Sequence, residues 1–247
     1  MLLLAALIGI WELYVDLHGS SFSLVLPAPH QVAASLYTDR GLLWSNFLVT
    51  AKEVLLGMLL ATIAGFVLAV AIHFSPTIRR AVYPLLVASQ AVPVVILAPV
   101  LVLWLGFGLL PKLVVIALVS FFSIVVTTTA GLAAVDPDLL KLMRTFDASR
   151  MRTFWHVELP AALPGVFTGA KIAAAVSVIG AVFAEWNGSN SGLGYVILQS
   201  LPQLLAARGV AAVVILSLFA IGLFSLLTLA ERLILPWAYP SREKHTW

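Results

Sequence analysis

Long apolar runs alternate with short polar segments along this chain, and the pattern predicts six membrane-spanning helices. At about 1.5 Å per helical residue, every run but the first is long enough to cross a hydrocarbon core of about 30 Å. The predicted spans are residues 2–17, 47–74, 81–105, 113–135, 161–184 and 210–235. Because lipid cannot satisfy backbone polar groups, we expect an all-α integral membrane protein with one transmembrane domain over residues 1–247.

The first run, residues 2–17, would span only about 24 Å as a helix, which is short of a full crossing. A signal peptide is the alternative, but no basic residues precede the run and no small-residue cleavage pattern follows it. We therefore favour a short or tilted first span. A translation start upstream of Met1 stays open.

Prolines and glycines mark features between and within the other spans. The turn Leu26-Pro27-Ala28-Pro29 leads into residues 30–43, whose apolar spacing predicts an amphipathic helix on the membrane surface. Gly57 and Gly65 in the second span favour close approach of a neighbouring helix. Near the start of that span, Lys52 and Glu53 are expected at the membrane interface.

The one long polar segment, residues 136–160, predicts a short amphipathic helical hairpin between spans four and five. Asp136 suits the N-cap, Pro137 suits the first helical position, and Asp138 complements the positive end of the helix. Pro160 favours a helix end at Leu159, since proline disfavours helical geometry in the residue before it. A capped amphipathic segment held on one side of a bilayer is typical of a docking site.

Composition supports the membrane assignment and narrows the chemistry. With 62% hydrophobic and 10% charged residues, too little polar surface remains for a soluble fold. The net charge of +3 arises mainly from loops, which argues against nucleic-acid binding. There is no cysteine, so disulfides and thiolate ligands are excluded. His73 and His156 lack partners at metal-ligand spacing, and we expect no metal site.

The distribution of basic residues predicts the orientation, because cytoplasmic loops carry an excess of Lys and Arg. Six spans place both termini on the same side of the membrane. Nine basic residues share that side: Arg79, Arg80, Lys141, Arg144, Arg150, Arg152, Arg232, Arg242 and Lys244. Arg40, Lys112 and Arg208 fall on the other side. We therefore expect cytoplasmic termini and a cytoplasmic segment 136–160.

The order of residues in this segment resembles the coupling segment of binding-protein-dependent ABC importer permeases. The pattern of that family is Glu-Ala-Ala, three residues, Gly, nine residues, Ile, one residue, Leu-Pro. Here Asp147 stands at the Gly position, Val157 at the Ile position, and Leu159-Pro160 is intact, whereas the triplet reads Lys141-Leu142-Met143. Asp tolerates left-handed backbone geometry better than most residues, so we expect the turn at Asp147.

Further signatures narrow the resemblance to permeases for nitrate, bicarbonate, taurine and aliphatic sulfonates, with relatives for pyrimidine thiamine precursors and riboflavin. They are Leu26-Pro27-Ala28-Pro29, Gln90-Ala-Val-Pro93, Ala98-Pro99, Trp104-Leu-Gly106-Phe-Gly108, Ala184-Glu185-Trp186 and Gly192-Leu193-Gly194. Because they occur in this order across nearly the whole chain, they are strong evidence for the family. They are poor evidence for the identity of the substrate.

The resemblance implies a type I ABC importer permease fold and a transport subunit of the bacterial inner membrane rather than an enzyme. The implied partners are a second copy in a homodimer, two P-loop ATPase subunits, an external substrate-binding protein and the lipid bilayer, with no nucleic acid. The chain has no Gly-x-x-x-x-Gly-Lys-Ser/Thr motif, so ATP and Mg²⁺ are expected on the partner ATPase and no cofactor on this chain.

Two sets of residues carry the expected function. Coupling to the ATPase is assigned to Arg144, Asp147, Ala148, Ser149, Arg150, Met151, Phe154, Leu159 and Pro160. Among these, Met151 and Phe154 are expected to be exposed apolar knobs. The translocation path is assigned to Gln90, Pro93, Pro99, Gly180, Ala184 and Glu185.

Prolines within a span free backbone carbonyls that can line a polar passage, although a helix kink made only for packing stays open for Pro93 and Pro99. A negative charge at Glu185, near the outer end of the path, would favour a neutral or zwitterionic solute such as a pyrimidine. An interfacial Glu185 stays open as well. An ion-coupled carrier and a polytopic membrane enzyme are the alternative functions. The scarcity of intramembrane carboxylates argues against the first, and the lack of hydrolytic motifs argues against the second.

Overall fold

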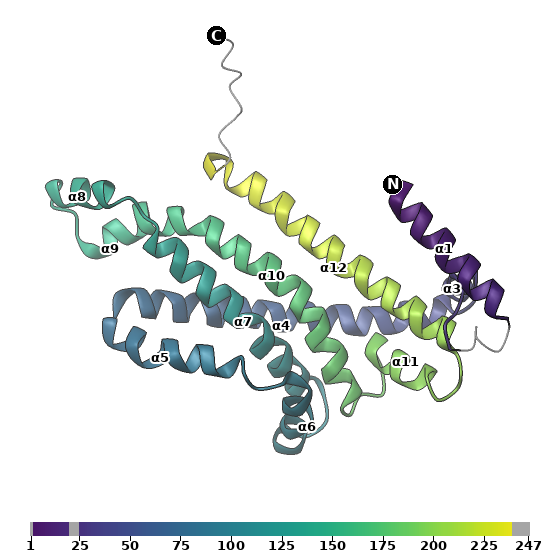
Figure 1. Ribbon diagram of the computed structural model, residues 1–247. Coiled ribbons are helices and arrows are strands. Elements are labelled where there is room, and N and C mark those ends of the chain that lie inside the picture. Colours follow the sequence, from purple (N-terminus) through teal and green to yellow (C-terminus); the bar gives the residue numbers. More distant parts are fainter. Residues whose placement is uncertain (1, 20–24, 239–247) are drawn as a thin grey trace, which may run out of the picture. The chain divides into compact units, whose positions relative to one another are not determined.

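The computed structural model describes residues 2–19 and 25–238, and all regular structure within these ranges is helical. Figure 1 shows the elements in chain order. They are α1 (Leu2–His18), α3 (Pro29–Thr38), α4 (Arg40–Phe74), α5 (Pro76–Ser89), α6 (Val94–Leu105), α7 (Leu109–Ala133), α8 (Pro137–Thr145), α9 (Arg150–Thr153), a π-turn (Phe154–Glu158), α10 (Leu159–Trp186), α11 (Leu193–Ser200), α12 (Ala206–Ile234) and a 3₁₀ turn (Pro236–Ala238). The basic residues Arg242 and Lys244, used above for orientation, lie outside the described residues.

Four of the described helices are long and apolar enough to cross a membrane. They are α4, α7, α12 and the continuous helix that runs from Arg150 through α10 to Trp186. The pair α5 and α6 meets the same criterion only when counted as one interrupted span, which would make five. With 17 residues, α1 is about 25 Å long, so a short first span stays a prediction.

The predicted boundary between the surface helix and the second span was wrong. The surface helix ends at Thr38, and α4 begins at Arg40 rather than at residue 47. Asp39 separates the two helices as the C-cap of α3, and its carboxylate accepts a hydrogen bond from Ser35 Oγ at 2.8 Å. Hydropathy placed the boundary too late because polar residues occupy the first turns of α4 without interrupting its backbone.

The third span is also interrupted, against the prediction of one helix over residues 81–105. The break lies between α5 and α6, where Gln90 caps α5 and Pro93 precedes the first residue of α6. Pro99 lies inside α6 and Pro84 inside α5, and neither of them ends its helix. Only the Gln90–Pro93 step therefore breaks this span.

The chain divides into two compact units. The first unit comprises Met1–Leu56, Val94–Val115 and Val178–Ala220, and the second comprises Gly57–Pro93, Ile116–Ser177 and Ile221–Trp247. Helices α4, α7, α10 and α12 each contribute residues to both units. The expectation of a single domain stays a prediction.

Close helix packing in the second unit depends on glycine, as the sequence predicted. A Cβ added to Gly57 of α4 would lie 2.5 Å from Ile116 Cγ2 of α7, and one added to Gly65 would lie 3.0 Å from Ile124 Cγ2. Further along the same two helices, Ala69 and Ile72 of α4 pack with Val125 of α7 and Leu86 of α5. The core of the first unit contains a cluster of Ala98, Val115 and Ala184.

Candidate functional site

Helix α8 opens the polar segment with the predicted cap. The Asp136 carboxylate accepts a hydrogen bond from the backbone N–H of Asp138 at 2.8 Å, and Pro137 occupies the first helical position. The second carboxylate, Asp138, lies in the first turn, where it complements the helix dipole. Local sequence therefore determines where this helix begins.

The turn after α8 is made by Asp147 in left-handed geometry, as predicted, with φ of 52°. Its backbone N–H donates to the Arg144 carbonyl at 3.0 Å, and the next N–H, from Ala148, donates to the Met143 carbonyl at 3.1 Å. These bonds satisfy carbonyls that the end of a helix would otherwise leave free. Ser149 then caps α9 by accepting a hydrogen bond from the N–H of Arg152 at 3.3 Å.

The prediction that Leu159-Pro160 ends the segment was wrong. Leu159 has helical angles, φ −63° and ψ −51°, and the helix runs without a break from Arg150 to Trp186. The π-turn at Phe154–Glu158 accommodates Pro160, because its wider hydrogen bonding, with the Leu159 N–H donating to the Phe154 carbonyl, relieves the crowding that proline causes in an ordinary α-helix.

An apolar face of the polar segment is exposed. No residue of α8 is buried, and Phe146, just after it, is 72% exposed. The exposed large apolar side chains of the segment are Leu139, Leu142, Phe146, Met151 and Trp155. Of these only Met151 was assigned to coupling from the sequence. The spacing of Leu139, Leu142 and Phe146 along one helical face was the signal that could have identified the others.

Phe154 contradicts the prediction of an exposed knob. It is 4% exposed and packs in a cluster with Leu132 of α7 and Ala162 of α10. Its ring also lies 5.0 Å from the Phe74 ring at the end of α4. Sequence reasoning took it as exposed because the residues around it are basic, and nothing local reveals the apolar partners.

The other residues assigned to coupling form two groups, one exposed to solvent and one half-buried. Arg144, Asp147, Ser149 and Arg150 are exposed, whereas Ala148, Leu159 and Pro160 are half-buried. The exposed members lie on α8, on the turn and on α9, so they belong to one continuous surface. We call the exposed face of residues 136–155 the docking face.

In the first unit, buried polar side chains hold the start of α11. Glu185, near the end of α10, is 1% exposed, and its Oε2 accepts hydrogen bonds from the backbone N–H groups of Gly194 at 2.5 Å and Tyr195 at 3.3 Å. Thr50 of α4 donates its hydroxyl to Glu185 Oε1 at 2.6 Å and accepts from the Leu193 N–H at 2.8 Å. The N-terminal amides of α11 are thus capped by side chains from two other helices.

Glycine at 192 and 194 makes room for this carboxylate. A Cβ on Gly194 would lie 2.9 Å from Glu185 Oε2, and a Cβ on Gly192 would overlap the carboxyl group itself. Gly192 also has φ of 110°, and its N–H donates to Asn46 Oδ1 at 2.7 Å. The Gly192-Leu193-Gly194 signature therefore fits the loop around Glu185.

A second buried carboxylate in the same unit is paired. Glu53 of α4 is 2% exposed, and its Oε1 accepts a hydrogen bond from Lys112 Nζ of α7 at 2.6 Å. Lys112 also donates to Ser189 Oγ at 2.7 Å. The expectation that Glu53 lies at the membrane interface was wrong, although Lys52 is exposed. Asn46, Thr50 and Glu53 share one helical face, and that spacing was the signal for an internal polar cluster.

The assigned path residues are not one cluster. Gln90 and Pro93 are exposed and belong to the second unit, whereas Pro99, Gly180, Ala184 and Glu185 belong to the first. Ala184 is buried against Ala98 and Val115. Hydrogen-bond donors and the glycine loop enclose the Glu185 carboxyl group, so the structure gives no support to a charge at the outer end of a passage.

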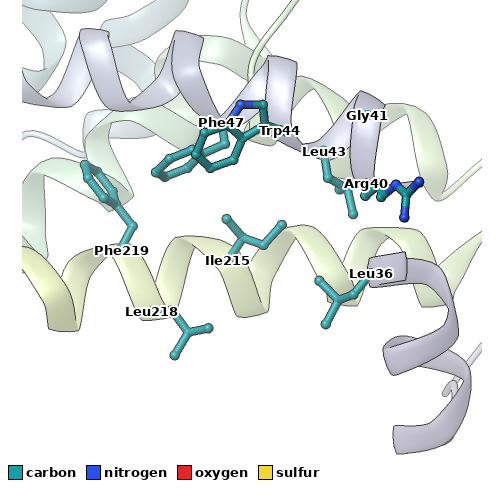
Figure 2. A pocket seen from close by; sticks show the side chains of 9 residues that line it. All are labelled: Leu36, Arg40, Gly41, Leu43, Trp44, Phe47, Ile215, Leu218 and Phe219. Atoms are coloured by element: carbon teal, nitrogen blue, oxygen red, sulfur yellow. The ribbon is translucent and has the colours of Figure 1, made fainter. Parts of the chain in front are cut away.

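A groove of about 610 Å³ lies in the first unit between α4 and α12. Figure 2 shows Trp44 and Phe47 on one side and Ile215 and Phe219 on the other, and the rings of Phe47 and Phe219 meet edge to face at 5.3 Å. Arg40 is the one charged residue in its lining. An apolar groove of this kind suits lipid chains rather than a small polar solute.

The first unit contains two further clusters of ionisable side chains. The Arg208 guanidinium donates to Asp39 Oδ1 at 2.8 Å, and this hydrogen bond holds the pKa of the Asp39 carboxyl below its usual value. Glu12, Asp16 and His30 bring potential metal-ligand atoms within 4.8 Å of one another. His30 Nδ1 contacts Glu12 directly, and the His30 backbone N–H donates to Glu12 Oε2 at 3.3 Å, so contacts within the protein already account for the closeness of Glu12 and His30.

Long apolar helices joined by an exposed, capped segment define a multi-pass membrane transport subunit. Residues 57–237 match the family of binding-protein-dependent transport system inner membrane components, and the chain belongs to this family. A probable ABC transporter permease protein of Haemophilus influenzae is 37% identical over 224 residues, which cover 91% of each chain. The formylaminopyrimidine transport permease protein of Halalkalibacterium halodurans is 34% identical over 232 residues, which cover 94% of this chain and 92% of the relative.

The fold agrees with that assignment. The inward-facing MetNI methionine ABC transporter matches with a TM-score of 0.65 at 18% identity, covering 78% of this chain and 97% of that chain. This likeness shows a type I ABC importer permease fold. More distant relatives are named as permeases for riboflavin, taurine, aliphatic sulfonates and nitrate, which confirms the predicted subgroup. The chain is thus a transport subunit rather than an enzyme, and in this family ATP hydrolysis belongs to a separate subunit.

Proposed function

We propose that two copies of this permease form a homodimer that takes a small polar solute from an external binding protein. Two ATPase subunits drive the cycle through the docking face. The observation that carries this proposal is the exposed apolar side chains on a segment otherwise rich in charge. An exposed apolar set of this kind, held by rigid caps, is typical of a surface that a partner covers.

The proposed orientation has the termini and the docking face in the cytoplasm. The excess of Lys and Arg on that side supports it. Within the described residues, the docking face itself carries Lys141, Arg144, Arg150 and Arg152.

The coupling assignment is tested by measuring whether the ATPase still co-purifies with variants of the docking face. We expect Phe146→Asp to abolish co-purification of the ATPase while the permease still inserts in the membrane, because the carboxylate would be buried unpaired in the interface. Phe107→Asp is the matched control, since Phe107 is the same residue type, is 81% exposed, and lies between α6 and α7, outside the docking face. Normal ATPase recovery with Phe146→Asp would rule out the docking face, and transport that persists without any ATPase would favour an ion-coupled carrier.

For the substrate we propose an aminopyrimidine of the thiamine-precursor type. The similarity to the formylaminopyrimidine permease over nearly the whole of both chains supports this choice. The earlier argument from the charge of Glu185 no longer contributes, since that carboxylate is enclosed. Uptake of labelled formylaminopyrimidine should require this chain, whereas uptake of taurine, nitrate or riboflavin should not. Uptake of one of these instead would replace the proposed substrate.

We keep Gln90, Pro93, Pro99, Gly180 and Ala184 as the proposed path. The exposed break at Gln90–Pro93, whose backbone leaves the helix, supports it. Single cysteines at the exposed positions 90 and 93 should react with a water-soluble thiol reagent, and their reactivity should change when ATP is trapped. The natural absence of cysteine gives this experiment no background. Unreactive sites in both states would mean that these residues pack against lipid or protein.

A further inference from the structure

The last two residues of α4, His73 and Phe74, are held by residues 150–158, which overlap the end of the segment that bears the docking face. Arg150, Phe154 and Glu158 recur at intervals of four residues through α9 and the π-turn, and each contacts the end of α4. All five residues belong to the second unit.

The contacts are specific and of three kinds. Glu158 Oε2 lies 2.9 Å from His73 Nε2, with side chains 13% and 21% exposed. Arg150 Nη2 donates to the Phe74 carbonyl at 3.1 Å, and its guanidinium lies 4.9 Å from the centroid of the Phe74 ring. The Phe154 ring packs 5.0 Å from the Phe74 ring and 6.3 Å from the His73 ring.

Each contact suits the transmission of force. A cation at the Phe74 carbonyl complements the negative end of the α4 dipole, and the buried Phe154 ring leaves no compressible gap. The π-turn contains both Phe154 and Glu158, and π-turns of this kind are frequent at functional sites. A movement of α9 must therefore either move the end of α4 with it or break all of these contacts together.

We propose that these five residues form a joint that transmits movement of the docking face directly to α4. Continuation of α9 into α10 gives one route into the membrane, and the joint gives a second, parallel one. His73 and Glu158 are the positioning residues of this joint. The inference rests on the proposed role of the docking face and identifies where its movement goes.

The test uses the whole transporter with its ATPase and binding protein. His73→Ala and Glu158→Ala each remove the contact between the two side chains, and the exchange variant His73→Glu/Glu158→His restores it with reversed partners. His30→Ala is the matched control, because it removes another His–Glu contact, with Glu12, which lies in the first unit and outside the docking face, with side chains 60% and 32% exposed. The readouts are ATPase co-purification, basal ATP hydrolysis, and the stimulation of hydrolysis by loaded binding protein.

We expect both single variants to retain ATPase binding and basal hydrolysis and to lose stimulation by about fivefold or more, a size typical of coupling between two sites. The exchange variant should recover most of the stimulation, and His30→Ala should match the wild type. Full stimulation in the single variants would overturn the joint. Loss of ATPase binding in them, or no recovery in the exchange variant, would overturn it as well, because the pair would then only maintain the fold. Failure of the wild type itself to bind the ATPase would instead refute the proposed function.

Discussion

The Glu185 carboxylate caps a helix to which it does not belong: its Oε2 accepts the backbone N–H of Gly194 at 2.5 Å. Helix α11 begins after Gly192, which has no side chain to serve as a cap. A carboxyl group from α10 therefore accepts the hydrogen bonds that the free N–H groups at a helix N-terminus need. The capped residues Gly192, Leu193 and Gly194 are part of the buried interior of the first unit.

Enlarging Gly194 should damage this arrangement. In Gly194→Ala the new methyl would lie 2.9 Å from both Glu185 Oε2 and Val182 Cα, and overpacking of this kind costs about 1–3 kcal/mol. We expect a lower Tm for the purified protein in detergent. Gly209→Ala is the control, because its methyl would meet only Ser200 Cβ at an ordinary 3.7 Å. Equal melting of the two variants would mean that the loop can move away from Glu185.

Breaking the Glu53–Lys112 pair from one side should be worse than removing both charges. Lys112→Met leaves a carboxylate that is 2% exposed without its cation, and loss of one partner of a buried pair typically costs about 3–5 kcal/mol. We expect the double variant Glu53→Gln/Lys112→Met to melt at a higher temperature than Lys112→Met alone. A double variant that is less stable than either single variant would show that the two side chains act independently.

Asp147 should tolerate glycine and resist valine. With φ of 52°, the position favours Gly and disfavours a β-branched side chain, so Asp147→Gly should leave assembly with the ATPase intact. Asp147→Val should impair it, as measured by co-purification. Normal assembly of the valine variant would show that the turn can be made without left-handed geometry.

Phe154 should be required for stability, in contrast to Phe146. Phe154→Ala removes a ring that is 4% exposed, and truncations of this kind cost about 3–5 kcal/mol. Phe146→Ala removes a ring that is 72% exposed and should leave the Tm unchanged while it weakens ATPase binding. The opposite pattern, with the ATPase lost and stability kept in Phe154→Ala, would restore Phe154 as an exposed knob.

Acid should weaken the contact between Asp39 and Arg208. The hydrogen bond from Arg208 lowers the pKa of the Asp39 carboxyl in the folded protein. The contact therefore contributes fully to folding stability at pH values above the pKa of Asp in the unfolded chain, about 3.9. It is lost as the pH falls through the lower folded pKa. We expect the Tm difference between wild type and Asp39→Asn to shrink as the pH falls from about 6 to about 3. A difference independent of pH would mean that the charge of Asp39 does not contribute.

Local chemistry explains what the sequence predicted well. The Asp136 cap and the left-handed turn at Asp147 depend on residues within a few positions of each other, so the chain reveals them directly. The long apolar helices follow from hydropathy alone. The Gly57 and Gly65 contacts with α7 follow from the small size of glycine.

The failures at Glu185 and Phe154 depend on distant partners. Glu185 and Thr50 are 135 residues apart, and no local pattern says that they meet. Phe154 was assigned to the surface because its neighbours are basic, whereas its burial is decided by Phe74 and Leu132. Leu159-Pro160 was taken as a helix end because the accommodating π-turn cannot be recognised from propensity.

The hydrogen-bonded backbone amides at the start of α11 should exchange slowly with heavy water. Four successive amides, from Gly192 to Tyr195, donate to Asn46, Thr50 and Glu185 rather than to solvent. Amides open to exchange only when such bonds break, and here they break only if α11 leaves α4 and α10. This Gly-rich stretch should therefore retain its protons as long as the helical cores do, and its deuterium uptake would report when the first unit loosens during a transport cycle.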